Sequence, residues 1–415
     1  MASKCTEFRL SDISIAITKG TTPVTYGHAY TTEGVNFVKS ESITPDGWID
    51  QSKFARISPE THAALARSHL MCGDILFSMA GVYLGKTAVV KESILPANCN
   101  QAVGIIRLRD DMADPNFIAY YIRNPAYNLF LNNLVSQSAQ PNFNLSEIRR
   151  LPIALPPLAE QKAIASVLGA LDDKIELNRR MNATLESMAR ALFQSWFVDF
   201  DPVRTKLDGR QPIGMDQATA ALFPDSFQES ELGHIPMGWE VKSLGEVIEL
   251  AYGKPLKAED RNNGPVCVYG ANGPIGWHDE KLVSGPGIVV GRKGNPGVVT
   301  WAHGDFYPID TTFYVEPIGA CRSFYFFYYA LSLHNLANLS ADSAVPGLNR
   351  NHAYMSNQVI PSQVVLTAFD SQIAPVFAAI QANEEQSRNL GTLRDTLLPK
   401  LLNGELALPL MPRAK

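Results

Sequence analysis

The 415-residue sequence lacks the features that mark secreted, membrane-spanning and zinc-binding proteins. Its five cysteines are scattered and form no C-x-x-C pair, which argues against a zinc site and favours thiols in a reducing compartment. No uninterrupted run of about 18 apolar residues occurs, so no membrane span is expected. The start of the chain has no apolar secretory segment, and the eight histidines show no metal-binding spacing. We therefore expect a cytoplasmic protein without a membrane partner or a metal site.

Strong positive charge is also missing. The formal net charge is -5 and the isoelectric point is near 5.9, the opposite of a protein that coats nucleic acid by itself. The acidic excess is concentrated in residues 158–235, which carry 8 basic and 12 acidic side chains. Any basic surface must therefore be local.

Residues 158–200 predict one long helix. Apolar positions recur in steps of four and three from Ile164 to Trp196, interrupted by Asn178 and Asn182, which is the a/d pattern of a coiled coil. Pro156-Pro157 precedes the helix and Asp201-Pro202 follows it, as expected at helix boundaries. The central seam positions are Ile164, Leu168, Leu171, Ile175, Asn178, Leu185 and Leu192.

The same pattern returns 205 residues later, together with flanking residues: Pro141, Asn144 and Pro156 recur as Pro346, Asn349 and Pro361. Asn178 corresponds to Asn383. We interpret this match as an internal duplication. The distal seam positions are Ile373, Val376, Ile380, Asn383, Leu390 and Leu397.

Short β-branched or aromatic runs, separated by glycine, proline and asparagine, precede each helix. The predicted fold class is therefore α+β, with two β-rich domains separated by a two-helix antiparallel coiled coil. A pseudo-two-fold axis between duplicated halves makes the two helices antiparallel. Asparagine in the seam would fix its register, although both asparagines could instead face solvent on a wider amphipathic helix. The predicted boundaries are 1–157 and 236–362 for the two domains, 158–200 and 363–415 for the helices with the C-terminal tail, and 201–235 for a linker.

One motif suggests an enzyme. "AGVYLGKT" (80–87) fits a relaxed P-loop pattern, in which Lys86 would contact phosphates and Thr87 would open a helix. The residues that follow are β-branched and soon reach Pro96, and the second copy has "KGNPGVVT" at this place. We favour a turn between strands, and keep a P-loop nucleotide-binding enzyme as an alternative function.

The residues of the repeat also carry a family resemblance. "LPIALPPLAEQKAIASVLGALDDKIELNRRMNATLESMARALFQSWFVDFDPVR" resembles the central region of the specificity (S) subunit of Type I restriction–modification systems. "GDILFSMAG" and "AQPNFNLSEI" match in the first half; "LGHIPMGWEV", "GRKGNPG", "PIDTTFYV" and "RDTLLPKLLNGEL" match in the second. The resemblance covers almost the whole chain and is most specific in the helices and the linker.

This resemblance implies a non-catalytic subunit whose two target-recognition domains each read one half of a bipartite site on double-stranded DNA. The coiled coil would set their spacing and dock two methyltransferase (M) subunits, and restriction/translocase (R) subunits would join them. S-adenosylmethionine, ATP and Mg would be bound by those partners, with no cofactor in this chain. The other alternative is a coiled-coil adaptor that no longer binds DNA.

Two groups of candidate contact residues follow. For DNA they are Lys86, Arg292 and Lys293 at phosphates, and Gln137, Gln140 and Asn142 at bases, since glutamine and asparagine can bond base edges. The segment around Asn142 belongs to the residues that recur 205 positions later, so a structural turn explains it equally well. For docking of the M subunits they are Phe193, Trp196 and Phe197, which could equally pack against their own domain.

Overall fold

A computed structural model describes residues 5–81, 84–135, 142–339 and 347–408. The chain divides into two compact units. The first unit comprises Met1–Glu176 together with Ser387–Lys415, and the second comprises Leu177–Gln386. Each unit therefore contains half of each long helix.

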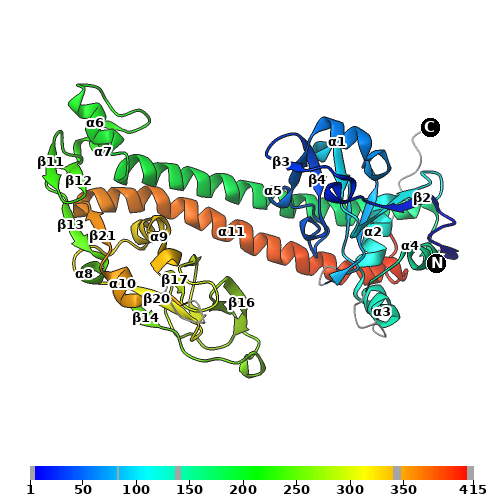
Figure 1. Ribbon diagram of the computed structural model, residues 1–415. Helices are drawn as coiled ribbons and strands as arrows, with labels where there is room; N and C mark the ends of the chain where they lie inside the picture. The colour runs from blue at the N-terminus through cyan, green and yellow to red at the C-terminus, as the bar shows by residue number, and fades with distance from the viewer. Residues whose placement is uncertain (1–4, 82–83, 136–141, 340–346, 409–415) are drawn as a thin grey trace. The chain divides into compact units, whose positions relative to one another are not determined.

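The long helices are α5 (Leu158–Phe197) and α11 (Gln363–Leu402), each of 40 residues. Both the first and the last residues of the two helices are 205 positions apart, which is the offset found in the sequence. Figure 1 shows both helices as unbroken ribbons.

The first unit contains, besides its parts of α5 and α11, two four-stranded sheets, ordered β2-β9-β6-β7 and β3-β5-β4-β8, and the pair β1–β10. Its strands are β1 (Thr6–Arg9), β2 (Ser14–Lys19), β3 (Tyr30–Thr31), β4 (Val35–Val38), β5 (Ala55–Ile57), β6 (Ile75–Ser78), β7 (Thr87–Val89), β8 (Ala97–Cys99), β9 (Val103–Leu108) and β10 (Pro152–Leu155). Its short helices are α1 (Pro59–Ala64), α2 (Pro115–Arg123), α3 (Pro125–Val135) and α4 (Leu145–Arg150).

The second unit has a four-stranded sheet, β14-β20-β17-β18, a three-stranded sheet, β16-β15-β19, and the pairs β13–β21 and β11–β12. Its strands are β11 (Phe227–Ser230), β12 (Gly233–Pro236), β13 (Glu240–Ser243), β14 (Ile248–Tyr252), β15 (Val266–Gly270), β16 (Gly273–His278), β17 (Gly287–Gly291), β18 (Val299–Ala302), β19 (Phe306–Pro308), β20 (Thr312–Pro317) and β21 (Asn357–Ile360). Its short helices are α6 (Asp201–Leu207), α7 (Gln217–Ala221), α8 (Leu244–Val247), α9 (Phe324–Leu333) and α10 (Arg350–Tyr354).

The two units share one topology, which confirms the α+β class and the duplication. The order β14-β20-β17-β18 repeats β2-β9-β6-β7, and β15–β19 repeats the parallel pair β4–β8. The pairs β1–β10 and β13–β21 join the start of each domain to the strand that leads into α5 or α11. The predicted linker differs from expectation, because it folds as α6, α7 and the hairpin β11–β12 and contributes the buried Phe223 to the core of the second unit.

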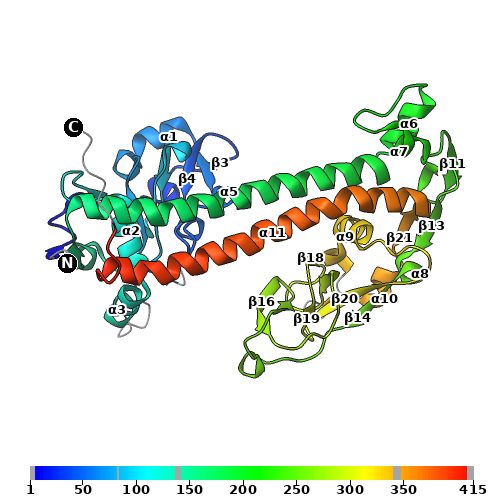
Figure 2. The same ribbon diagram turned by 180° about the vertical axis from the view of Figure 1, so that it is seen from behind.

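The helices are antiparallel within each unit. In the second unit Asn178 Nδ2 donates to Gln386 Oε1 at 2.9 Å, Asn383 Nδ2 to Asn182 Oδ1 at 2.8 Å, and Asn182 Nδ2 to the carbonyl of Ile380 at 3.3 Å. Residue numbers on α11 thus fall as those on α5 rise. Figure 2 shows the orange start of α11 beside the end of α5 in this unit.

The predicted seam positions are covered to different degrees. Each of the thirteen is buried or half-buried, and Asn178 is 0% exposed. Because Asn178 also donates to the Asn383 carbonyl at 3.3 Å, the asparagines form a polar layer inside the helix pair. They are not solvent-facing positions of a wider amphipathic face.

A buried charge network holds the helix halves of the first unit. Arg394 Nη1 lies 2.7 Å from Asp172 Oδ1, and Tyr120 Oη donates to Asp172 Oδ2 at 2.6 Å. Burial raises the pKa of Tyr120, so its hydroxyl remains a donor. In the repeat, Asp172 and Arg394 correspond to Phe377 and Ala189, both buried in the apolar core of the second unit. The helix pair is therefore stabilised by a buried ion pair and a hydrogen bond in the first unit and by apolar packing in the second.

The apolar character of α11 serves this packing. An 18-residue window of α11 has a mean hydropathy of 1.4, so by length and composition alone this helix could cross a membrane, although no uninterrupted apolar run exists. Phe369, Ile373 and Phe377 of α11 are buried in the core of the second unit. The core therefore covers part of the apolar surface of this helix.

Replacing Asn178 and Asn383 together by leucine should raise the thermal unfolding midpoint. Leucine adds buried apolar surface at a seam where asparagine specifies register at a cost in stability. A gain of 1 kcal/mol corresponds to about 2–4 °C for domains of this size. Calorimetry should show this gain, whereas Ser371→Leu with Thr396→Leu, at exposed positions of α11, should show little. An unchanged or lower midpoint would contradict a buried polar layer.

Asp172→Ala should destabilise the first unit by about 3 kcal/mol, since it removes the buried partner of Arg394 and the acceptor of Tyr120. The control is Asp173→Ala, whose carboxylate pairs with Lys91 at 3.0 Å on the surface and should cost less than about 1 kcal/mol. Urea unfolding measures both values. Equal losses would show that the network has no special role.

Candidate nucleic-acid interface

Several loops of the second unit converge at one end of its sheets. We call these segments, residues 252–254, 291–297, 308–312 and 347–350, the second loop cluster. Backbone hydrogen bonds join them: Gly253 to Thr312, Lys254 to Pro308, Arg292 to Thr311, and Leu348 to Arg292, with N···O distances of 3.2, 3.1, 2.9 and 2.9 Å. Loops fixed by a sheet framework are a common place for recognition residues.

The first unit repeats this arrangement in residues 19–21, 79–80, 99–103 and 142–145, the first loop cluster. Gly20 donates to Val103, Thr21 to Cys99, Met79 to Ala102 and Phe143 to Met79, with N···O distances between 2.8 and 2.9 Å. In each cluster, the residue that directly follows β6 or β17 bonds to two other loops, to one through its backbone N–H and to the other through its carbonyl. Met79 and Arg292 therefore occupy equivalent positions.

A glycine permits the close approach of loops in each cluster. A Cβ atom at Gly20 would lie 2.2 Å from the carbonyl oxygen of Asn100, and one at Gly253 would lie 2.2 Å from that of Ile309. Both distances are too short for any other residue without movement of the backbone. The equivalence of Gly20 and Gly253 also makes Lys19 equivalent to Tyr252.

An asparagine cap closes each cluster. The Asn144 side chain accepts from the backbone N–H groups of Ser146 and Glu147 at the start of α4. Asn349 accepts from Asn351 and His352 at the start of α10. Such caps satisfy N–H groups that a helix leaves without partners. The repeated asparagines of the sequence are thus part of the frame that positions the loops.

The structure brings two of the predicted phosphate contacts into the second loop cluster. Arg292 is half-buried and its Nη1 donates to the carbonyl of Asp310 at 3.0 Å. Lys293 is exposed, and its backbone forms an isolated bridge with Gly347. Asn142 forms the equivalent bridge with Ala80 in the first unit and is exposed. Gln137 and Gln140 lie outside the described residues.

Lys86 has a different environment. Its residue is half-buried, and burial lowers the pKa of its ammonium group, with a further lowering from the charge of Lys53 and an opposing effect from Asp46. Thr87 is the first residue of strand β7, and its buried hydroxyl lies 3.4 Å from the carbonyl oxygen of Ala119. Gly81 and Gly85 have φ angles of 69° and 76°, as in a turn. A P-loop requires a helix at Thr87, so this geometry argues against the nucleotide-binding alternative.

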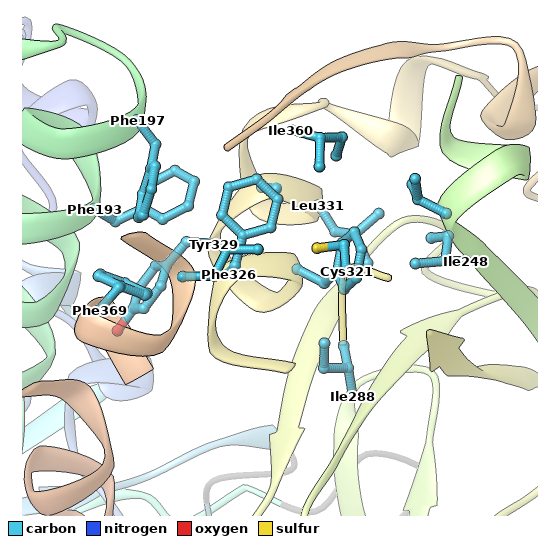
Figure 3. Packing of buried hydrophobic residues seen from close by; sticks show 14 of the residues in the cluster. Phe193, Phe197, Ile248, Ile288, Cys321, Phe326, Tyr329, Leu331, Ile360 and Phe369 are labelled. Carbon is cyan, nitrogen blue, oxygen red and sulfur yellow. The ribbon is translucent and has the colours of Figure 1, made fainter. Parts of the chain in front are cut away.

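The predicted docking residues are not on the surface. Phe193, Trp196 and Phe197 are 2%, 2% and 4% exposed in the core of the second unit. Figure 3 shows Phe193 and Phe197 beside Phe326 of α9 and Phe369 of α11. The apolar end of α5 is covered by its own domain, so these three side chains cannot form an outward docking face.

Sequence reasoning missed three side chains of the second loop cluster. Tyr252 ends β14 and is 49% exposed, Lys254 is exposed in the next loop, and Arg350 opens α10. The Arg350 guanidinium lies 5.0 Å from the ring centre of Tyr252. Aligning "AITKGTT" (16–22) with "LAYGKPL" (250–256) on their glycines would have marked Tyr252 as a loop position that differs between the copies.

Comparison with known proteins agrees with this architecture. A family model described as the Type I restriction modification DNA specificity domain matches residues 3–187 and 236–361. The chain is 26% identical to the Type I restriction enzyme HindI specificity subunit of Haemophilus influenzae, over 82% of this chain and 88% of that protein. It is 25% identical to the MjaIX specificity subunit of Methanocaldococcus jannaschii, over 78% of this chain and 75% of that protein.

A solved structure shares the fold. The crystal structure of the Type I restriction–modification system S subunit from M. genitalium aligns with a TM-score of 0.55 and 18% identity, over 96% of each chain. The family model matches twice, once in each half, on the halves that the structure shows to be duplicated. The chain therefore belongs to the family of Type I restriction–modification DNA specificity subunits.

Proposed function

We propose that each unit reads one half of a bipartite double-stranded DNA target through its loop cluster. The main support for this proposal is that the two loop clusters share their backbone arrangement but differ in their side chains. Both units repeat the same backbone hydrogen bonds, loop glycine and asparagine cap. The side chains at equivalent positions differ: Lys19 is half-buried and Met79 lies in the core of the first unit, whereas Tyr252 is exposed and Arg292 is half-buried in the second. Two units with the same backbone arrangement and different side chains fit a DNA target whose two half-sites differ in sequence.

Local charge supports DNA as the ligand of the second loop cluster. Lys254, Arg292, Lys293 and Arg350 are four cationic side chains in its segments, which contain one carboxylate, that of Asp310. Phosphate contacts supply most of the affinity in protein–DNA binding. Because the whole chain has a net charge of -5, we infer that partner subunits provide much of the positive surface that surrounds the duplex.

The helix pair is proposed to act as a spacer of fixed register. The polar layer around Asn178 and the ion pair of Asp172 with Arg394 each oppose sliding of one helix along the other. A fixed register is what a defined gap between half-sites requires. The same pair is proposed to dock two M subunits, and the exposed Met181 and Met188 of α5 are apolar side chains that the chain's own domains leave uncovered.

We propose that the partner subunits carry out the catalytic reactions. In this proposal M subunits bind S-adenosylmethionine and transfer methyl groups to adenine, and R subunits use ATP and Mg. This chain then contributes recognition without catalysis. We place the complex in the cytoplasm, consistent with the five cysteines, all in the described ranges, of which none forms a disulfide.

Exchanging residues 1–157 for the first domain of another family member should change one half of the methylated target and leave the other half unchanged. The full chain would be assembled with its M subunits, and methylated adenines would be mapped by sequencing across a genome. The unmodified complex and the M subunits alone are the controls. An unchanged target after the exchange would favour the adaptor that no longer binds DNA.

A further inference from the structure

Tyr252 is flanked by two arginines from different loops. The guanidinium carbon of Arg292 lies 4.8 Å from its ring centre, and that of Arg350 lies 5.0 Å away. Two other rings complete the arrangement, since Arg292 lies 5.8 Å from Phe313 and Arg350 lies 5.6 Å from Tyr354. A guanidinium within about 6 Å of an aromatic ring gains cation–π stabilisation. The three side chains therefore form one ordered group, which we call the Arg–Tyr–Arg group.

Hydrogen bonds fix both arginines without using up their donors. Arg292 Nη1 donates to the Asp310 carbonyl at 3.0 Å, and Arg350 Nη1 donates to the Leu250 carbonyl at 3.4 Å. A guanidinium has five N–H donors in a rigid plane. Among the residues that the structure describes, neither arginine forms an ion pair with a carboxylate. Each guanidinium group therefore keeps N–H donors for a ligand, and its side chain loses little conformational entropy on binding.

The equivalent positions of the first unit have different chemistry. Tyr252, Arg292 and Arg350 correspond to Lys19, Met79 and Leu145, of which Met79 is buried in the core of the first unit. The frame beneath is the same, because Tyr354 corresponds to Arg149 and the two contact equivalent strand residues. Tyr354 Oη accepts from the N–H of Leu250 at 2.8 Å, and Arg149 Nη2 donates to the carbonyl of Ile17 at 2.9 Å. The duplicated frame is retained while the three loop side chains change.

This contrast favours bases over phosphates as the ligand. Phosphate contacts position a protein on any DNA sequence, whereas contacts to base edges specify the sequence. Groups serving the common backbone would be expected in both copies. Arginine donating two hydrogen bonds to O6 and N7 of guanine is the commonest specific contact in the major groove.

We propose that Arg292 and Arg350, held in place by Tyr252, read guanine in the half-site of the second unit. This inference rests on the proposed function, since it names the side chains by which one unit selects its half of the target. Tyr252 is a positioning residue, because it orders the guanidinium groups that contact the bases.

The duplication supplies the test variants. Arg292→Met and Arg350→Leu each introduce the side chain that the first unit has at the equivalent position. The chain would be assembled with its M subunits and offered a library of double-stranded DNA with both half-sites randomised. Each variant should lose preference for guanine at one or two positions of a single half-site by about tenfold or more. The preferences at the other half-site should remain those of the unmodified complex.

Two further variants separate positioning from charge. Tyr252→Leu keeps both arginines but removes the ring, and should weaken the same guanine preference. Lys257→Ala removes an exposed cation paired with Glu259 outside the loop cluster, and should leave the preference unchanged. Thermal unfolding of every variant checks that the second unit still folds.

The outcomes separate this inference from the function on which it rests. A uniform loss of affinity for all sequences, with the salt dependence reduced by about one phosphate contact, would show that the arginines bind the backbone and would overturn the inference. Unchanged base preferences in folded variants would also overturn it. If the unmodified complex selects no sequence, the proposed function itself fails.

Discussion

The pairing of α5 with α11 is the interaction on which the rest of the molecule depends. Each helix contributes one half to each unit, so neither unit has a complete core without both. In the first unit Leu168 of α5 shares a core with Leu398 and Leu401 of α11. In the second, Phe193 of α5 packs against Phe369 of α11, with ring centres 6.1 Å apart. Folding of either domain therefore requires segments about 200 residues apart in the sequence, and docks the helices in one register.

Polar groups give this pairing its specificity. An entirely apolar seam would tolerate a shift by one heptad, whereas the hydrogen bonds from Asn178 Nδ2 to Gln386 and Asn383, and the ion pair of Asp172 with Arg394, form in one alignment. A shift would leave buried polar atoms without partners, which costs more than the hydrogen bonds contribute when they are formed. The asymmetry of the two halves adds a second constraint, since a buried charge network in one unit is replaced by an aromatic core in the other. The two units share a duplicated backbone arrangement, and different side chains make each half of the helix pair distinct.

In the loop clusters, too, the residues that fix the backbone recur in both units, whereas the other side chains differ. Glycine at positions 20 and 253, and asparagine at positions 144 and 349, are determined by backbone geometry and recur in both copies. The side chains between them are free of that requirement and differ. Membership in the DNA specificity family fits such a design, because recognition residues are commonly carried on loops that a rigid scaffold positions.

The sequence by itself determined the helices, their antiparallel pairing and the duplication, because heptad spacing and a constant offset of 205 are visible without coordinates. It also indicated that Gly81 and Gly85 serve a turn between strands, since β-branched residues follow them. It could not determine which face of α5 is covered, and Phe193, Trp196 and Phe197 proved to be core residues, because burial depends on the domain that packs against a helix. The Arg–Tyr–Arg group was decided by tertiary structure alone. Tyr252, Arg292 and Arg350 come from three loops separated by 40 residues or more, and only the folded sheet brings their side chains together.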